Sequence, residues 1–246
     1  MSQSTESTTE ANPFTKPGFI IAAALVVALI AAAVVIFLLP KGQGNAQPSP
    51  AESSNSATAK PIGSAPAGKS VCGLPASQET ALGTPPKSKW ELVGAMAVPT
   101  DPSTSGPGTV GKDGLRSCFA QSPTGALYAT ANIWAASFNG YAKQVYLELA
   151  ADSPSRDKAV QAIKEGKDVS GGSSPKVQIA GFILHSYTPE AAVVELAIKS
   201  SDGGYGAFST SLVWEDGDWK LDIPAAGGGT VRQISDLSSF IPWAGV

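Results

Sequence analysis

Residues 19–39 form an uninterrupted apolar run, and this run constrains the architecture of the chain more than any other feature. It holds 21 residues, mostly Ala, Val, Ile and Leu, without a charged or strongly polar side chain. As a helix it would be about 32 Å long, enough to cross a hydrocarbon layer of about 30 Å. A buried helix of a soluble domain would show polar positions at regular intervals. The run therefore predicts a single transmembrane helix.

A cleaved signal peptide is the main alternative for this run. Signal peptides place a basic segment before an apolar core of about 7–15 residues. Here residues 1–18 contain Glu6 and Glu10 against Lys16 alone. A cleavage-like Gly-Asn-Ala at residues 44–46 keeps the alternative open. The preferred interpretation is an uncleaved anchor preceded by a disordered tail.

Residues 40–70 are rich in Ser, Pro, Ala and Gly, and they separate the apolar run from the rest of the chain. From residue 42 onward, Ile62 is their only large apolar side chain. Such a segment cannot bury enough surface to offset the entropy of ordering, so it is predicted to be a disordered linker. Residues 71–246 then remain for one folded domain of ordinary size.

Cys72 and Cys118 are the only cysteines in the chain, and both follow the predicted anchor. A disulfide between them would persist in an oxidising compartment, which places the domain outside the cytoplasm and the N-terminus inside. Charge gives no direction of its own, because Lys16 and Lys41 balance each other across the run. Two buried, unpaired thiols are the alternative.

Helices are predicted in the first half of the domain, after an irregular lead-in at residues 71–121. The lead-in contains one strand-like run at residues 90–98. Two Ser-Pro pairs, at residues 122–123 and 153–154, each place a capping Ser before a Pro at the first helical position. The three predicted helices cover about residues 123–137, a short segment ending near 151, and 154 to about 166.

Apolar residues alternate with a period of two from Lys176 onward, which predicts strands. Val177, Ile179 and Ile183 are taken to share one face of the first strand. Turn residues at 202–204 and at Asp216-Gly217 divide the pattern into a four-stranded antiparallel meander. Residues 231–240 look helical. Helices followed by strands predict an α+β domain in which three helices pack on a curved antiparallel sheet.

The closing hairpin carries a resemblance to a known fold. Residues 212–222 read Leu-Val-Trp-Glu-Asp-Gly-Asp-Trp-Lys-Leu-Asp, and with the preceding helices and strands they resemble the end of the NTF2-like cone. A single-pass anchor, a Ser/Pro/Ala-rich linker and such a domain together resemble the VirB8-like family of type IV secretion and conjugation machines. The run Ser-Pro-Thr-Gly-Ala-Leu at residues 122–127 is similar to versions from high-GC Gram-positive bacteria. The resemblance covers about residues 90–243.

This resemblance implies a noncatalytic assembly or scaffold component. Its partners would be the membrane and other membrane proteins of a secretion or conjugation complex, and it also implies a homo-oligomer. Nucleic acid is not expected as a partner, because 17 basic residues against 20 acidic ones give a net charge of -3 without a basic cluster. A third, weaker interpretation is an accessory of a lipid importer in the cell envelope.

A ligand-binding protein or enzyme is the alternative function, built on a candidate cavity of His185, Phe208, Trp214 and Trp219. In this interpretation His185 shares its face with Val177 and Ile179 and serves as a general base. The simpler interpretation is a hydrogen-bonded histidine at the rim, with the aromatic rings in the core. One His and two Cys cannot form the common zinc or iron sites, and no cofactor motif is present, so no cofactor is predicted.

Three carboxylates surround the closing turn, at Glu215, Asp216 and Asp218. Alternating oxygen ligands of this kind are compatible with a cation site. Carboxylates beside a turn glycine more simply accept hydrogen bonds from local backbone N–H groups. The turn interpretation is preferred, and no metal is predicted.

Overall fold

The computed structural model describes residues 68–169, 176–225 and 231–245. Every described residue belongs to the compact unit Lys60–Val246. The predicted tail, the predicted transmembrane helix and residues 40–67 of the predicted linker lie outside the described residues. Within the described part, no helix is both long enough and apolar enough to cross a membrane.

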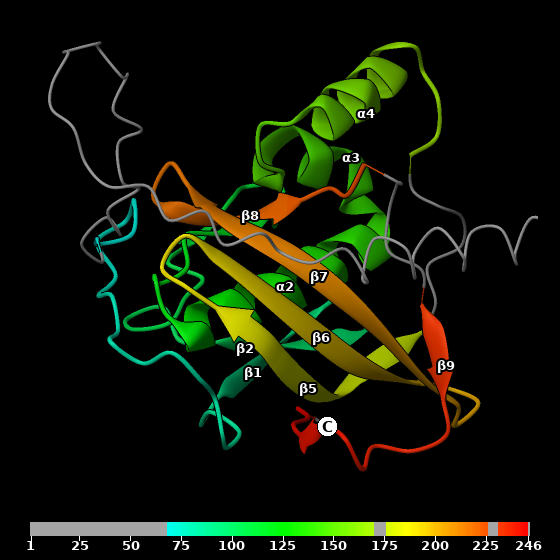
Figure 1. The fold of residues 1–246 in the computed structure, drawn as a ribbon. Helices are drawn as coiled ribbons and strands as arrows, with labels where there is room; N and C mark the ends of the chain where they lie inside the picture. The colour runs from blue at the N-terminus through cyan, green and yellow to red at the C-terminus, as the bar shows by residue number, and fades with distance from the viewer. Residues whose placement is uncertain (1–67, 170–175, 226–230, 246) are drawn as a thin grey trace, which may run out of the picture. The chain divides into compact units, whose positions relative to one another are not determined.

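An antiparallel sheet built from the four predicted strands forms the centre of the domain (Figure 1). In spatial order these strands are β5 (Val177–Tyr187), β6 (Ala191–Ser200), β7 (Tyr205–Glu215) and β8 (Asp218–Asp222). Two short strands complete the sheet: β10 (Ile241–Pro242) pairs with β5, and β9 (Arg232–Ile234) pairs with β7. The predicted α+β class with an antiparallel meander is confirmed.

The helices begin where the Ser-Pro pairs predict. In α2 (Pro123–Ala136), Ser122 Oγ accepts a hydrogen bond from Gly125 N at 2.9 Å, and in α4 (Pro154–Lys164), Ser153 Oγ accepts one from Arg156 N at 3.1 Å. Between them lie η2 (Ser137–Tyr141), α3 (Ala142–Gln144) and η3 (Val145–Leu149). The path bends at Gly140, whose φ of 90° is readily adopted only by glycine.

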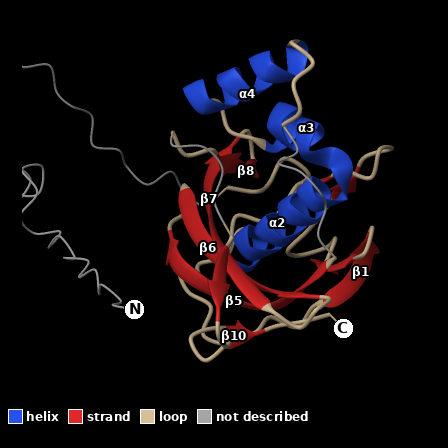
Figure 2. Cartoon of the chain, turned by 90° about the vertical axis from the view of Figure 1, so that its right-hand side faces the viewer, coloured by secondary structure: helices blue, strands red, loops and turns tan. Residues whose placement is uncertain are grey.

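The first predicted helix packs fully into the core, and the second contributes Val145 and Leu149 to it. Almost every residue of α2 is buried, because the helix contacts the sheet on one side and β2 on the other (Figure 2). A helix covered on all sides needs small and apolar residues throughout, as α2 has. The described α4 has no buried residue and contacts η3 instead. The expectation of three helices packed on the sheet is therefore wrong for the third helix, whose sequence is largely polar.

The lead-in is more regular than predicted. The run at residues 90–98 is two strands, β1 (Lys89–Val93) and β2 (Met96–Thr100), joined at Gly94 with a φ of 60°. A second small hairpin joins β3 (Thr109–Val110) to β4 (Arg116–Ser117). Both faces of β1 are largely exposed, and so is β3. These two strands therefore lack the alternation of apolar and polar residues that marks a half-buried strand.

The prediction of a helix at residues 231–240 is also wrong. These residues form β9 and turns that lead to β10, so the chain crosses from the β7 edge of the sheet to its β5 edge. We call residues 232–242 the C-terminal strap. Ile234, Leu237 and Phe240 recur every three residues, which imitates a helix, but they pack against Ile183, Ala197 and Ala207 on the sheet face opposite α2. We call the face of the sheet opposite α2 the outer face.

Candidate functional site

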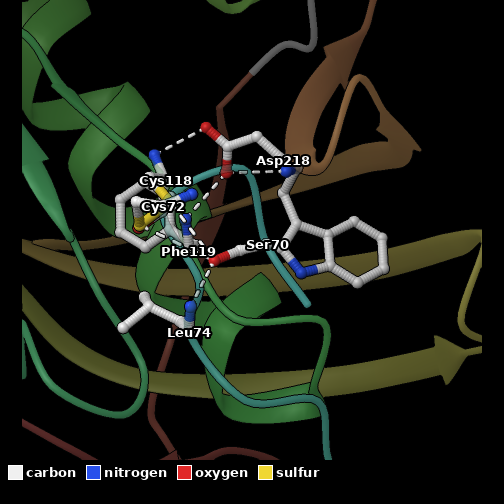
Figure 3. Close-up of a disulfide and its surroundings, with 7 residues drawn as sticks. Ser70, Cys72, Leu74, Cys118, Phe119 and Asp218 are labelled. Carbon is white, nitrogen blue, oxygen red and sulfur yellow. Dashed lines mark hydrogen bonds between the residues drawn. A yellow bond between two sulfur atoms is a disulfide. The ribbon is translucent and has the colours of Figure 1, made fainter. Parts of the chain in front are cut away.

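The predicted disulfide between Cys72 and Cys118 is present in the structure (Figure 3). The two Cα atoms lie 6.1 Å apart, and Cys72 N donates a hydrogen bond to Cys118 Sγ at 3.0 Å. Cys118 is buried, whereas Cys72 is exposed. The bond therefore joins the beginning of the described domain to a buried position next to α2.

The residues around Cys72 are held against the closing hairpin by hydrogen bonds. Val71 N donates to Gly217 O at 2.8 Å, and Leu74 N donates to Ser70 Oγ at 2.8 Å. The same Ser70 Oγ lies 3.3 Å from Cys118 Sγ. Gly68 N also donates to Gln121 Oε1 at 2.6 Å. Residues 68–70, predicted as the end of the disordered linker, are thus part of the folded domain, because the disulfide fixes the chain immediately after them.

Asp218 is the buried carboxylate at this junction (Figure 3). It accepts hydrogen bonds from three backbone N–H groups: Cys118 at 2.6 Å, Phe119 at 2.8 Å and Trp219 at 2.9 Å. Burial raises the pKa of Asp218 above its ordinary value, because desolvation of the carboxylate outweighs these hydrogen bonds. Two of its donors are 99 and 100 residues away in sequence, so local turn chemistry accounts for only one of the three bonds.

The other two turn carboxylates do not join Asp218 in a cluster. Glu215 accepts a hydrogen bond from Asp152 N at 3.2 Å, and Asp216 occupies the turn with a φ of 53°. Within the described residues, no group of three His, Cys, Asp or Glu side chains is placed to hold a metal ion. Asp218 has a structural role: its carboxylate accepts hydrogen bonds from backbone N–H groups and thereby connects the closing hairpin to residues 118–119.

His185 lies on the outer face, away from the predicted cavity aromatics. β5 carries irregularities between Ile179 and Gly181 and between Leu184 and Ser186, and each shifts the alternation of its side chains. As a result Ile179 and Phe182 both join the main core, while Ile183 packs on the outer face. The prediction that His185 shares a face with Val177 and Ile179 is wrong because a strict period of two does not survive these bulges.

On the outer face His185 belongs to a hydrogen-bonded trio with Glu195 and Arg232. His185 Nε2 lies 2.8 Å from Glu195 Oε2, and Arg232 donates to Glu195 Oε1 at 2.6 Å. The Glu195 side chain is only 5% exposed. Burial favours its neutral form, but the hydrogen bonds from His185 and Arg232 outweigh burial and hold the pKa of Glu195 below its ordinary value. The trio joins β5, β6 and the C-terminal strap.

The three predicted cavity aromatics pack in the main core. Phe208 is 1% exposed and its ring centroid lies 4.1 Å from that of Trp134. Trp219 is also 1% exposed, donates from Nε1 to Ala120 O at 2.9 Å, and lies 5.3 Å from the ring of Trp214. These contacts match the interpretation of the rings as core and separate all three from His185.

A cavity that the sequence did not predict lies between the helices and the free edge of β7. Its volume is about 480 Å³, and α2, η2, η3, β7 and β8 all contribute to its wall. None of His185, Phe208, Trp214 and Trp219 lines it. The wall combines residues from segments up to 98 positions apart, as Ile133 and Val231 show. Only the tertiary fold brings such residues together, and no short motif marks them.

These features define the class of protein: a disulfide-containing α+β domain with an antiparallel meander. The chain belongs to the family described as a domain of unknown function, DUF8175, which matches residues 51–242. No curated protein and no solved structure matches the chain. The family match includes the junction at Cys72, the meander and the C-terminal strap up to Pro242.

Proposed function

We propose that this chain is a single-pass membrane protein whose extracytoplasmic domain acts as a noncatalytic assembly or scaffold component of a conjugation or secretion machine. The observation that carries the proposal is the Cys72–Cys118 disulfide, which joins the beginning of the domain to its core. Disulfides persist outside the reducing cytoplasm. Combined with the apolar run at residues 19–39, this supports a domain displayed on the outer side of a membrane.

The order of elements supports an NTF2-like arrangement of the domain. Helices α2 to α4 precede the meander β5 to β8, and α2 lies along the face of the sheet opposite the C-terminal strap. The closing hairpin, on which the resemblance to the NTF2-like cone rests, is anchored by two of its residues, Trp219 and Asp218. A fold of this kind is used by many functions, so it supports the architecture and leaves the role to the site.

The position of His185 supports a binding role over catalysis. A general base needs a free nitrogen within hydrogen-bond reach of a bound substrate. Glu195 engages only the Nε2 atom of His185, but the ring lies on the face opposite the core aromatics and does not line the described cavity, where a substrate could be held. Scaffold function instead requires a stable surface, and the disulfide and the strap both stabilise the domain. The proposed partners are other membrane proteins and a second copy of the chain, without nucleic acid.

Chemical cross-linking in native membranes tests this proposal. The full chain is purified under denaturing conditions through a tag at its carboxyl end, beside a control in which residues 1–70 carry an unrelated secreted domain. We expect several multispan membrane proteins or a secretion ATPase with the full chain and not with the control. The His185→Ala variant should capture the same partners and support the same cellular function, because its ring contributes only to the hydrogen-bonded trio.

Two results would contradict the scaffold role. One is recovery of the chain alone, or of the same proteins with the control, because the folded domain would then contribute no partner. The other is loss of cellular function in His185→Ala at unchanged protein level and stability. That loss would restore the enzyme interpretation, for which His185 is the only histidine in the chain.

A further inference from the structure

Within the described residues, the edge of β7 that faces β8 and β9 is only partly paired. β8 pairs with residues 211–215 of β7, and β9 pairs with residues 205–207. Between them no described strand pairs with residues 208–210 on this edge, as the separation of β8 and β9 along β7 shows (Figure 1). The 480 Å³ cavity lies behind this gap.

Three aromatic side chains line the cavity without being fully buried. They are Trp134, Phe138 and Tyr146, and all three are half-buried. Elsewhere in the core the large aromatic side chains Tyr128, Phe182 and Trp219 are at most 1% exposed. Apolar ring surface that faces an open cavity gains free energy when a ligand removes it from water. The cavity volume lies within the range of about 300–1,000 Å³ that is usual for small-molecule sites.

Among the buried side chains that the described wall contains, Thr210 carries the one hydroxyl. Trp134 Nε1 donates to Thr210 Oγ1 at 2.7 Å, and the Ser137 hydroxyl donates to Ile133 O at 2.9 Å. A threonine hydroxyl that accepts one hydrogen bond still carries its own hydrogen. Thr210 is buried and lines the cavity, so its hydroxyl is positioned to donate to an oxygen of a bound molecule.

The charge of the wall decides which molecules fit. Among the described lining residues Asp222 is the only charged one, and none is Lys, Arg or His. An anion would lose its hydration without gaining a cationic partner, which is costly in an apolar site. We propose that this cavity binds a small molecule that is not an anion and that has a flat apolar body with one carbonyl or hydroxyl oxygen. The inference does not depend on the scaffold role or on the membrane anchor.

Photolabelling of the full chain in lipid nanodiscs tests the site. The probe is benzophenone, which is flat, uncharged and carries one carbonyl oxygen, and the matched control is its 4-carboxylate. We expect saturable benzophenone adducts on residues 133–146, mapped by mass spectrometry, and about tenfold fewer adducts with the carboxylate because an unpaired charge is costly in an apolar site.

Two matched variants make the result specific. Leu221 is half-buried, packs against the main core and lines the cavity, so Leu221→Trp should fill it and reduce labelling of residues 133–146 by about tenfold, since a filled pocket excludes the ligand. Leu184 is half-buried on β5, packs against the same core and does not line the cavity, so Leu184→Trp should leave labelling unchanged. Adducts that do not saturate, that form equally with the carboxylate, or that persist in Leu221→Trp at unchanged stability would overturn the proposal.

Discussion

The double variant Cys72→Ser/Cys118→Ser is expected to lose about 4 kcal/mol of free energy of unfolding. The bond closes a loop of 46 residues, and its removal returns that conformational freedom to the unfolded chain. All five tryptophans lie after residue 89, so tryptophan fluorescence in guanidinium reports unfolding of the domain even when the full chain is studied in detergent. The midpoint should move to markedly lower guanidinium concentration.

Reduced wild-type protein provides the control for this experiment. It should lose about the same stability as the double variant, because both lack the cross-link and differ only in the atoms at two positions. An unchanged midpoint in both samples would contradict the assignment of the disulfide as a major source of stability. A loss in the double variant alone would point to disturbed packing around Cys118, which is buried.

Replacement of the buried carboxylate in Asp218→Ala is expected to cost about 3 kcal/mol or more, since each buried donor left without an acceptor costs about 1–3 kcal/mol. The affected donors are the backbone N–H groups of Cys118, Phe119 and Trp219. Asp202→Ala is the matched control, because Asp202 is an exposed turn carboxylate that accepts from Gly204 N. It should cost well under 1 kcal/mol, as most exposed substitutions do. Equal losses in both variants would contradict the structural role of Asp218.

The pH dependence of Asp218→Asn follows from the same carboxylate. Its pKa is raised in the folded domain, so the native state binds this proton more tightly than the unfolded chain. The contribution of Asp218 to stability is therefore complete below the unfolded pKa and decreases as pH rises through the raised folded pKa. The Asn variant lacks this titration. The stability advantage of wild type over Asn should be larger near pH 3 than near pH 7, as measured by guanidinium unfolding at both pH values. A larger advantage near pH 7 would show that the folded pKa is lowered instead.

Local sequence signals predicted the elements that depend on local chemistry. The Ser-Pro pairs marked the starts of α2 and α4, and Asp216-Gly217 marked the last turn of the meander. The face on which each side chain of β5 lies was not predictable in the same way. The bulges of β5 arise from its pairing with β6, and the apolar–polar alternation before Gly181 does not indicate them. The position of His185 on the outer face follows from those bulges.

The parts of the candidate site that the sequence did not predict depend on distant contacts. Asp218 reaches residues 118 and 119 only because the disulfide junction and the closing hairpin meet in the folded domain. The strap looked helical because three apolar residues at three-residue steps satisfy either a helix or a segment lying across a sheet. The cavity depends on where β8 and β9 stop along β7, and strand ends are set by tertiary packing rather than by local preference.

The redox state of the two cysteines in the cell tests the central claim most directly, because the chain has no other cysteine. Cells that produce the full chain are quenched in acid, free thiols are alkylated under denaturing conditions, and a second, heavier reagent is added after reduction. An extracytoplasmic domain predicts no label from the first reagent and two from the second, read as a mass shift. Two thiols alkylated before reduction would place the domain in a reducing compartment and contradict the proposed topology.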